Sequence, residues 1–203
     1  DARVELAVHW GYALELGGDA SPAIIPSLDD TNSVIGKLIA LAASQPQRFP
    51  LFVLANRPLL SGWDKLPEET WCHDEQGQRL TNAPQWKLWS PEVPDSVYRQ
   101  AGAATAAVIA EIRRRAPIAI VLNGGEYGLN YFGHSGAYWQ QDPQIVAAKG
   151  EQSWFEYSSA RKGHLERIYG DAIREACPDM QLYLWYHFDG IPSWTSWQYS
   201  RDY

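Results

Sequence analysis

Four short apolar runs divide the chain, and longer stretches of mixed polarity lie between them. The runs are Val4 to Trp10, Leu51 to Ala55, Ile118 to Leu122 and Gln181 to Phe188. The middle two are apolar at every position, which is typical of strands buried on both faces of a parallel sheet. We therefore predict a strand in each run.

Helices are predicted between the runs, because apolar residues recur there every three or four positions. The first covers Asn32 to Ser44, and the second covers Pro94 to Arg115 and ends in three arginines that complement the helix dipole. The third begins at a capping box formed by Ser153 and Glu156 and closes at Cys177-Pro178. The alternation of strand and helix predicts right-handed βαβ units.

The connections between these elements fall into two length classes. Helix-to-strand connections are short (45–50, 116–117 and 178–180), whereas strand-to-helix connections are long (11–31, 56–93 and 123–152). In a β/α barrel all strand-to-helix loops lie on one face and build the active site. A doubly wound sheet is less favoured, because no G-x-G-x-x-G or Walker A motif follows a strand. We therefore expect an α/β chain of the (β/α) TIM-barrel type.

The chain gives four strands in 203 residues, whereas a complete barrel has eight strands in about 250. We expect residues 1–203 to be a single catalytic domain, the N-terminal part of a barrel whose C-terminal half is the missing partner. A self-contained four-unit α/β domain is the alternative. Because the chain opens at Asp1 and its only methionine is Met180, a processed or trimmed N-terminus is also expected.

Charge and hydropathy exclude two classes of partner. The net charge is -7 and the pI is near 5.2, with no stripe of Lys or Arg, which argues against nucleic acid. No apolar run approaches the roughly 20 residues of a membrane span. We expect neither a nucleic-acid nor a membrane partner.

Ten tryptophans and eleven tyrosines are the unusual feature of the composition. Most of the tryptophans fall in segments rich in Pro, Gly, Asn and Gln. They could stack on the flat faces of sugars or simply fill a core. The same two alternatives apply to the long second loop, which carries Trp63, Trp71, Trp86 and Trp89 and is either a wall of a saccharide cleft or a flap with its own small core.

The third apolar run leads through Asn123 and two glycines directly into Glu126. Gly124 and Gly125 permit backbone angles barred to other residues and leave room for a ligand. A glutamate held at the mouth of an apolar barrel would be partly desolvated, which raises the pKa of its carboxyl towards general-acid duty. A solvated loop glutamate, or a partner for a nearby arginine, is the alternative.

The segment Asn123-Gly124-Gly125-Glu126-Tyr127-Gly128 resembles the N-E-Y-G signature of clan A glycoside hydrolases, especially the β-galactosidases. The resemblance implies that Glu126 is the acid/base and that Tyr127 lies at the substrate. The family has Asn where this chain has Gly125, and that Asn contacts the 2-hydroxyl of the sugar. Asn123 is the candidate substitute. In the family the strand is the fourth, whereas here it is the third.

Glycosidases need a second carboxylate, about 5 to 5.5 Å or about 6.5 to 9.5 Å from the first. The family pattern places it on a later strand, outside this chain. Within the chain the candidate is Asp189, as base or nucleophile, although it could equally cap the turn at Gly190. Trp185, His187 and Asp189 alternate onto one face of the predicted strand, so the first two are candidate sugar contacts.

Polar and aromatic residues also end the first two strands. His9 and Trp10 end the first, while Asn56 and Arg57 end the second. We expect all four to face the same mouth, where polar groups can bind sugar hydroxyls and Trp10 can stack. A histidine at a strand end is more commonly a structural group.

Three functions compete. The first is an O-glycosyl hydrolase for oligo- or polysaccharide with Glu126 as proton donor and no cofactor, expected to be secreted or periplasmic. The second is a non-catalytic carbohydrate-binding protein. The third, a metal-dependent hydrolase using His9, His187 and Asp189, is weak because the first strand lacks H-x-H. Cys72 and Cys177 lack metal-ligand spacing and form either one disulfide or two unrelated thiols.

Overall fold

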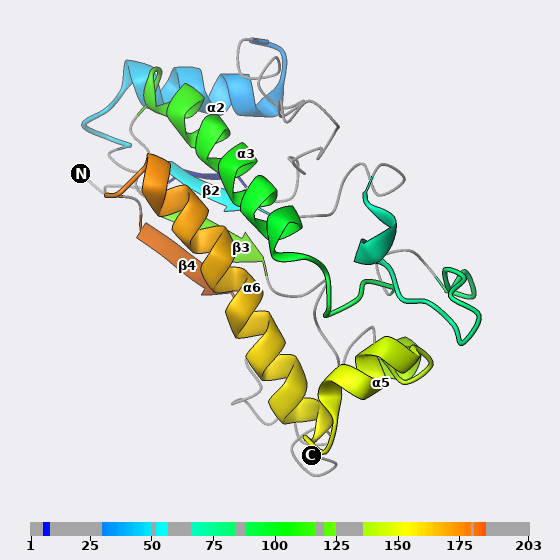
Figure 1. Ribbon diagram of the computed structural model, residues 1–203. Helices are drawn as coiled ribbons and strands as arrows, with labels where there is room; N and C mark the ends of the chain where they lie inside the picture. Colours follow the sequence, from blue (N-terminus) through cyan, green and yellow to red (C-terminus); the bar gives the residue numbers. More distant parts are fainter. Residues whose placement is uncertain are drawn as a thin grey trace, which may run out of the picture. The chain divides into compact units, whose positions relative to one another are not determined.

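The computed structural model describes residues 6–8, 30–49, 52–56, 66–83, 88–116, 120–124, 136–179 and 181–185, and within the strands it describes the backbone (Figure 1). The chain divides into two compact units, each assembled from separate segments. Unit 1 contains residues 1–66, 96–124 and 167–184, and unit 2 contains residues 67–95, 125–166 and 185–203.

Each of the four predicted strand segments contains a strand. They are β1 (Leu6–Val8), β2 (Phe52–Asn56), β3 (Ile120–Gly124) and β4 (Gln181–Trp185). The strands form one sheet in the order β1-β2-β3-β4. β2 is parallel to β1 and to β3, and Figure 1 shows the arrows of β2, β3 and β4 pointing the same way. The predicted parallel pairing of the continuously apolar runs is confirmed for β2 and β3.

Two of the predicted helices contribute to unit 1. The first, α2 (Val34–Ser44), begins where the Ser33 hydroxyl accepts a hydrogen bond from the Gly36 N–H at 2.9 Å. The second, α3 (Asp95–Arg113), has ten buried residues, spaced to give a continuous apolar face: Val97, Tyr98, Ala101, Gly102, Ala104, Thr105, Ala106, Val108, Ile109 and Ile112. Both helices confirm the prediction from apolar periodicity.

The third predicted helix, α6 (Trp154–Ala176), begins in unit 2 and ends in unit 1. Its last three turns lie against α3, where a buried hydrogen bond of 2.9 Å joins the hydroxyls of Thr105 and Tyr169. Gly102 allows the close approach, since a Cβ there would stand 2.5 Å from the Tyr169 carbonyl oxygen. Figure 1 shows these parts of α3 and α6 over the same face of the sheet.

Unit 2 has a core of its own, built from the two segments expected to be long loops. It contains the 3-10 helix η2 (Glu68–Thr70), the short helices α4 (Gly136–Trp139) and α5 (Pro143–Lys149), and the first part of α6. Isolated antiparallel bridges pair Trp71 with Trp89 and His73 with Arg79. The Trp139 indole N–H donates to the Trp89 carbonyl at 2.7 Å, so the aromatic core is also tied by a hydrogen bond.

The predicted TIM-type β/α barrel is wrong. Of the residues whose side chains the structure describes, 60% are helical and none lies in a strand, and no barrel is shown. The four strands form one sheet whose order begins at β1 and finishes at β4. Apolar periodicity reports which short segments become strand or helix. Closure of a sheet depends on strand number, tilt and stagger, which periodicity does not encode.

Candidate functional site

Three of the predicted site residues lie in the described strands, and all three stand at carboxyl ends. Asn56 is the last residue of β2, and Asn123 is the last but one of β3. These two asparagines are register partners across the parallel β2–β3 pair. Trp185 is the last residue of β4. Asn56 and Asn123 therefore stand at the same level of the sheet, a register that the sequence analysis did not predict.

The other predicted site residues lie outside the described residues: His9, Trp10, Arg57, Glu126, Tyr127, His187 and Asp189. Along the chain each follows a strand closely. His9 comes directly after β1, Arg57 directly after β2, and Glu126 two residues after the end of β3. Their roles stay predictions.

The structure shows the environment of two of the four tryptophans in the second loop. Trp71 and Trp89 are 1% and 2% exposed, and Trp139 is fully buried. Rings buried to this extent cannot stack on a sugar, so the alternative of a flap with its own core is the correct one for Trp71 and Trp89. Trp63 and Trp86 lie outside the described residues.

Asp142 is a buried carboxylate that fixes the second segment of unit 2 onto the first. It is 3% exposed and caps α5, accepting hydrogen bonds from the backbone N–H groups of Gln144 at 2.9 Å and Ile145 at 3.3 Å. Its other oxygen accepts from the His73 N–H at 2.8 Å. With its oxygens occupied by backbone donors, Asp142 has a structural role.

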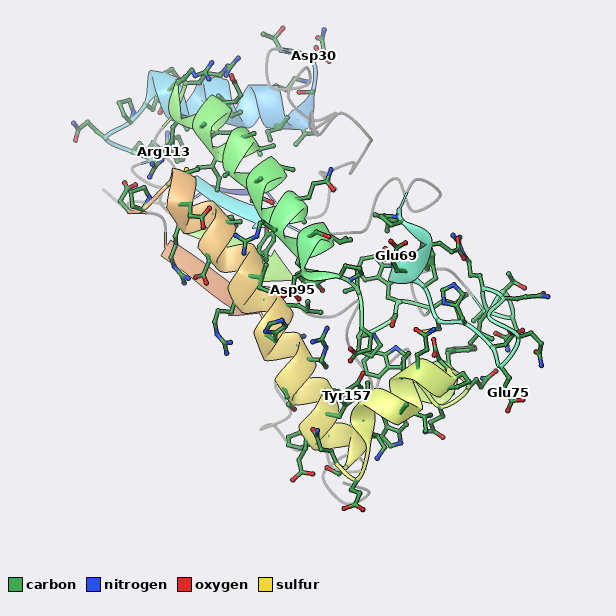
Figure 2. All side chains as sticks on the ribbon, in the orientation of Figure 1. Asp30, Glu69, Glu75, Asp95, Arg113 and Tyr157 are labelled. Atoms are coloured by element: carbon green, nitrogen blue, oxygen red, sulfur yellow. The ribbon has the colours of Figure 1, made fainter. Side chains whose placement is uncertain are left out.

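A polar row on α6 was not found by sequence reasoning, which examined only the apolar face of that helix. Tyr157, Arg161 and His164 are spaced by four and three residues and therefore share one face. They meet carboxylates at the start of α3 and just before it: Tyr157 and Arg161 meet Glu92, and His164 meets Asp95. Figure 2 labels Tyr157 and Asp95 at the two ends of this row. The spacing of these polar residues along the predicted helix could have revealed the row from the sequence.

The residues of this row form hydrogen bonds and ion pairs that have a structural role. The Tyr157 hydroxyl donates to the Glu92 carboxylate at 2.5 Å, and the Arg161 Nε lies 3.2 Å from the same oxygen. Arg161 also donates to the Pro91 carbonyl at 2.8 Å. Burial, and then the Glu92 carboxylate, raise the pKa of Tyr157 far above its ordinary value, so the phenol stays protonated. We assign the row to holding residues 91–95 against α6.

A second charged cluster surrounds Glu68 in η2. The Arg79 guanidinium donates to both oxygens of Glu68, at 3.0 and 2.5 Å, and the His73 Nε2 lies 3.2 Å from one of them. Hydrogen bonding to Arg79 holds the pKa of Glu68 below its ordinary value. Arg79 also lies over the Trp71 ring, 4.8 Å from its centre. The lowered pKa makes Glu68 a poorer proton acceptor than an ordinary glutamate, and its two partners, His73 and Arg79, are themselves paired by an antiparallel bridge.

Metal and thiol chemistry find no support in the described part of the chain. No group of three His, Cys, Asp or Glu side chains there is placed to hold a metal ion. Cys72 and Cys177 are both free and buried, so the alternative of two unrelated thiols is the correct one. Burial raises the pKa of both thiols, which disfavours the reactive thiolate.

The comparisons with known proteins give no assignment. No protein-family model, no curated protein and no solved structure matches the chain. Among the helices described here, none combines the length and apolar character needed to cross a bilayer.

Proposed function

We propose that the chain is an O-glycosyl hydrolase that cleaves an oligo- or polysaccharide, with Glu126 as the proton donor and no cofactor. The observation that carries the proposal is the segment Glu126-Tyr127-Gly128, which follows an apolar strand and resembles the acid/base motif of the β-galactosidases. The protein is also proposed to be secreted or periplasmic.

The fold supports this proposal through the positions of the strand ends, and no barrel is required. In folds built from parallel strands and helices, ligand sites are made at the carboxyl ends of the strands. β3 ends at Gly124, so Glu126 follows that end by two residues, and Arg57 follows the end of β2 directly. The asparagines that precede them are register partners. The proposed site therefore draws on two neighbouring strands.

The proposed reaction divides the work between two carboxyl groups. Glu126, protonated, donates its proton to the oxygen of the leaving sugar as the glycosidic bond breaks. Asp189 is the candidate within this chain for the second carboxylate, attacking the sugar or activating a water. His9, Arg57, Tyr127 and His187 are proposed to bind hydroxyls, and Trp10 and Trp185 to stack on a sugar face.

The test is hydrolysis of a panel of 4-nitrophenyl glycosides and soluble polysaccharides by the whole chain. Glu126→Gln is expected to lower kcat/KM by about 100-fold or more, because general-acid catalysis contributes about 10²- to 10⁴-fold. The matched control is Glu75→Gln, an exposed glutamate in a turn of unit 2 (Figure 2), which is expected to leave the rate unchanged.

Two outcomes would contradict the proposal. An unaltered rate in Glu126→Gln removes the proton-donor role. Saturable binding of a polysaccharide by the wild-type chain, with no hydrolysis of any panel member, instead identifies a non-catalytic carbohydrate-binding protein.

A further inference from the structure

A two-stranded ribbon lies in the core of unit 2 and is buried on both faces. Residues 70–72 run antiparallel to residues 88–90, and backbone hydrogen bonds of 2.7 and 2.9 Å join the two segments. None of these six residues is more than 5% exposed. Polar side-chain groups on the ribbon are therefore cut off from bulk water and need partners inside the unit.

Two polar groups of this ribbon differ from others in the same core. The Trp139 indole N–H, for example, donates to the Trp89 carbonyl at 2.7 Å. The Thr70 hydroxyl and the Trp71 indole N–H are buried as well, but neither has a hydrogen-bond partner among the residues that the structure describes. A buried donor without a partner loses its hydration and gains nothing in exchange, which destabilises the folded chain.

We propose that the Thr70 hydroxyl and the Trp71 indole N–H each form a hydrogen bond to a water molecule held inside unit 2. The indole N–H is a donor only, so it cannot bind a cation. The buried carboxylate of Asp142 accepts from the N–H of His73, two residues along the chain from Trp71, and its negative charge disfavours an anion there. A neutral acceptor small enough for a core of large side chains is water. The inference does not depend on the proposed function.

Water suits these two groups in chemistry and in number. It can accept from the indole N–H, and it can either donate to the hydroxyl or accept from it. Each carbonyl oxygen has two lone pairs, so backbone carbonyls that are already bonded within the ribbon can still accept a proton from the water. Globular proteins hold about one buried water per 27 residues, so two are ordinary for a unit that contains residues 67–95, 125–166 and 185–203.

The site at Trp71 is tested by NMR on the whole wild-type chain, labelled with ¹³C and ¹⁵N so that the indole signals are assigned through bonds. Magnetisation transferred from water to the Trp71 indole proton is measured as NOE and as ROE. A bound water gives the two opposite signs, whereas exchange of the indole proton gives them the same sign, and opposite signs are expected. Trp139, fully buried and bonded to a carbonyl, is the control and shows no transfer. Repeating the measurement in Thr70→Val excludes transfer relayed by the Thr70 hydroxyl.

The site at Thr70 is tested by thermal unfolding of Thr70→Val, which replaces the hydroxyl by a methyl group of similar size. A hydroxyl bonded to water loses a hydrogen bond in this variant, so Tm is expected to fall by about 2 to 4 °C. The matched control is Thr105→Val, which removes an equally buried hydroxyl that bonds to the Ala101 carbonyl and the Tyr169 hydroxyl, and a similar fall is expected. An unpaired hydroxyl at Thr70 predicts the opposite sign, because its removal ends a desolvation cost.

A Tm that rises in Thr70→Val while it falls in Thr105→Val overturns the water at Thr70. Should Thr70→Val not fold, Thr70→Ser is compared with Thr70→Ala. A higher Tm for the serine variant supports the water, and an equal or higher Tm for the alanine variant overturns it. Absence of transfer at Trp71, or NOE and ROE of the same sign, overturns the water at Trp71.

Discussion

Tyr157 shows how a single buried hydroxyl is held in unit 2. The residue is 3% exposed, and its proton lies in a hydrogen bond to Glu92. Burial disfavours the phenolate, and the carboxylate beside it disfavours the phenolate further, so the folded state raises the pKa of Tyr157. The folded chain therefore binds this proton more tightly than the unfolded chain does.

Replacing Tyr157 by Phe is expected to lower the free energy of unfolding by about 1 to 2 kcal/mol, because a hydrogen bond to a charged acceptor is lost. Urea unfolding at pH 7 measures the change. Tyr138→Phe, at a half-buried position on α4, is the control. A loss in Tyr157→Phe no larger than the loss in the control would show that the bond to Glu92 contributes nothing.

The same residue predicts a pH dependence at the alkaline end. Its pKa is raised on folding, so its contribution to stability is complete below the unfolded value of about 10 and declines as the pH rises above that value. The stability difference between wild type and Tyr157→Phe should therefore shrink from pH 9 to pH 11. Thermal unfolding across that range measures it, and a constant difference would contradict the assigned cause.

At the scale of single elements, the start of α6 agrees with its sequence signature. The Ser153 N–H donates to the Glu156 carboxylate at 2.9 Å, and the Glu156 N–H donates to the Ser153 hydroxyl at 3.2 Å, which completes the predicted capping box. Hydrogen bonds from the Ser153 backbone and hydroxyl lower the pKa of Glu156.

Glu156→Gln should therefore cost stability at pH 7 and progressively less in acid. A carboxyl whose pKa is lowered on folding contributes stability above its unfolded value, and that contribution disappears as the pH falls through the folded value. The difference in Tm between wild type and Glu156→Gln, followed from pH 7 to pH 3, should decline below about pH 4.5. A difference that persists at pH 3 would point to another cause.

Two of the helical glycines, Gly102 and Gly163, predict opposite effects of substitution by alanine. A Cβ at Gly102 would stand 2.5 Å from the Tyr169 carbonyl oxygen and 2.7 Å from the Ala172 Cβ, whereas a Cβ at Gly163 meets nothing within 4 Å. Overpacking costs about 1 to 3 kcal/mol, which exceeds the gain of about 1 kcal/mol in helix propensity. Gly102→Ala should destabilise the chain and Gly163→Ala should stabilise it by about 0.5 to 1 kcal/mol. Urea unfolding of both variants is the measurement, and equal stability of the two would contradict the close packing of α3 on α6.

Long helices were predicted from the sequence, and short helices were not. α2, α3 and α6 carry enough turns for apolar periodicity to reveal them. α5 has seven residues, and its cap, Asp142, is held in part by the His73 N–H, 69 residues away in the chain. Asp142 and Pro143 at its start and Gly150 at its end are nevertheless local helix signals, which the sequence analysis did not use. The segment around α5 was therefore mistaken for a loop.

At the scale of the whole chain, the strand segments were predicted correctly and the barrel architecture was wrong. Loops expected to stand over an active site contain a second compact unit with a tryptophan core. Aromatic composition could not distinguish a core from a sugar-binding surface, because both need large flat rings. For the candidate site, the position of Asn56 and Asn123 at or next to strand ends was predicted, but their register was not, because sequence patterning does not encode which residues of parallel strands pair.

The central claim, that Glu126 protonates the departing sugar oxygen, is tested most directly by varying the leaving group. A 2,4-dinitrophenolate departs without a proton, whereas a phenolate benefits from one. Glu126→Gln should lower kcat/KM for the phenyl glycoside by about 100-fold or more and for the 2,4-dinitrophenyl glycoside by about tenfold at most. An equal loss for both substrates, or no loss for either, would contradict the role of Glu126 as proton donor.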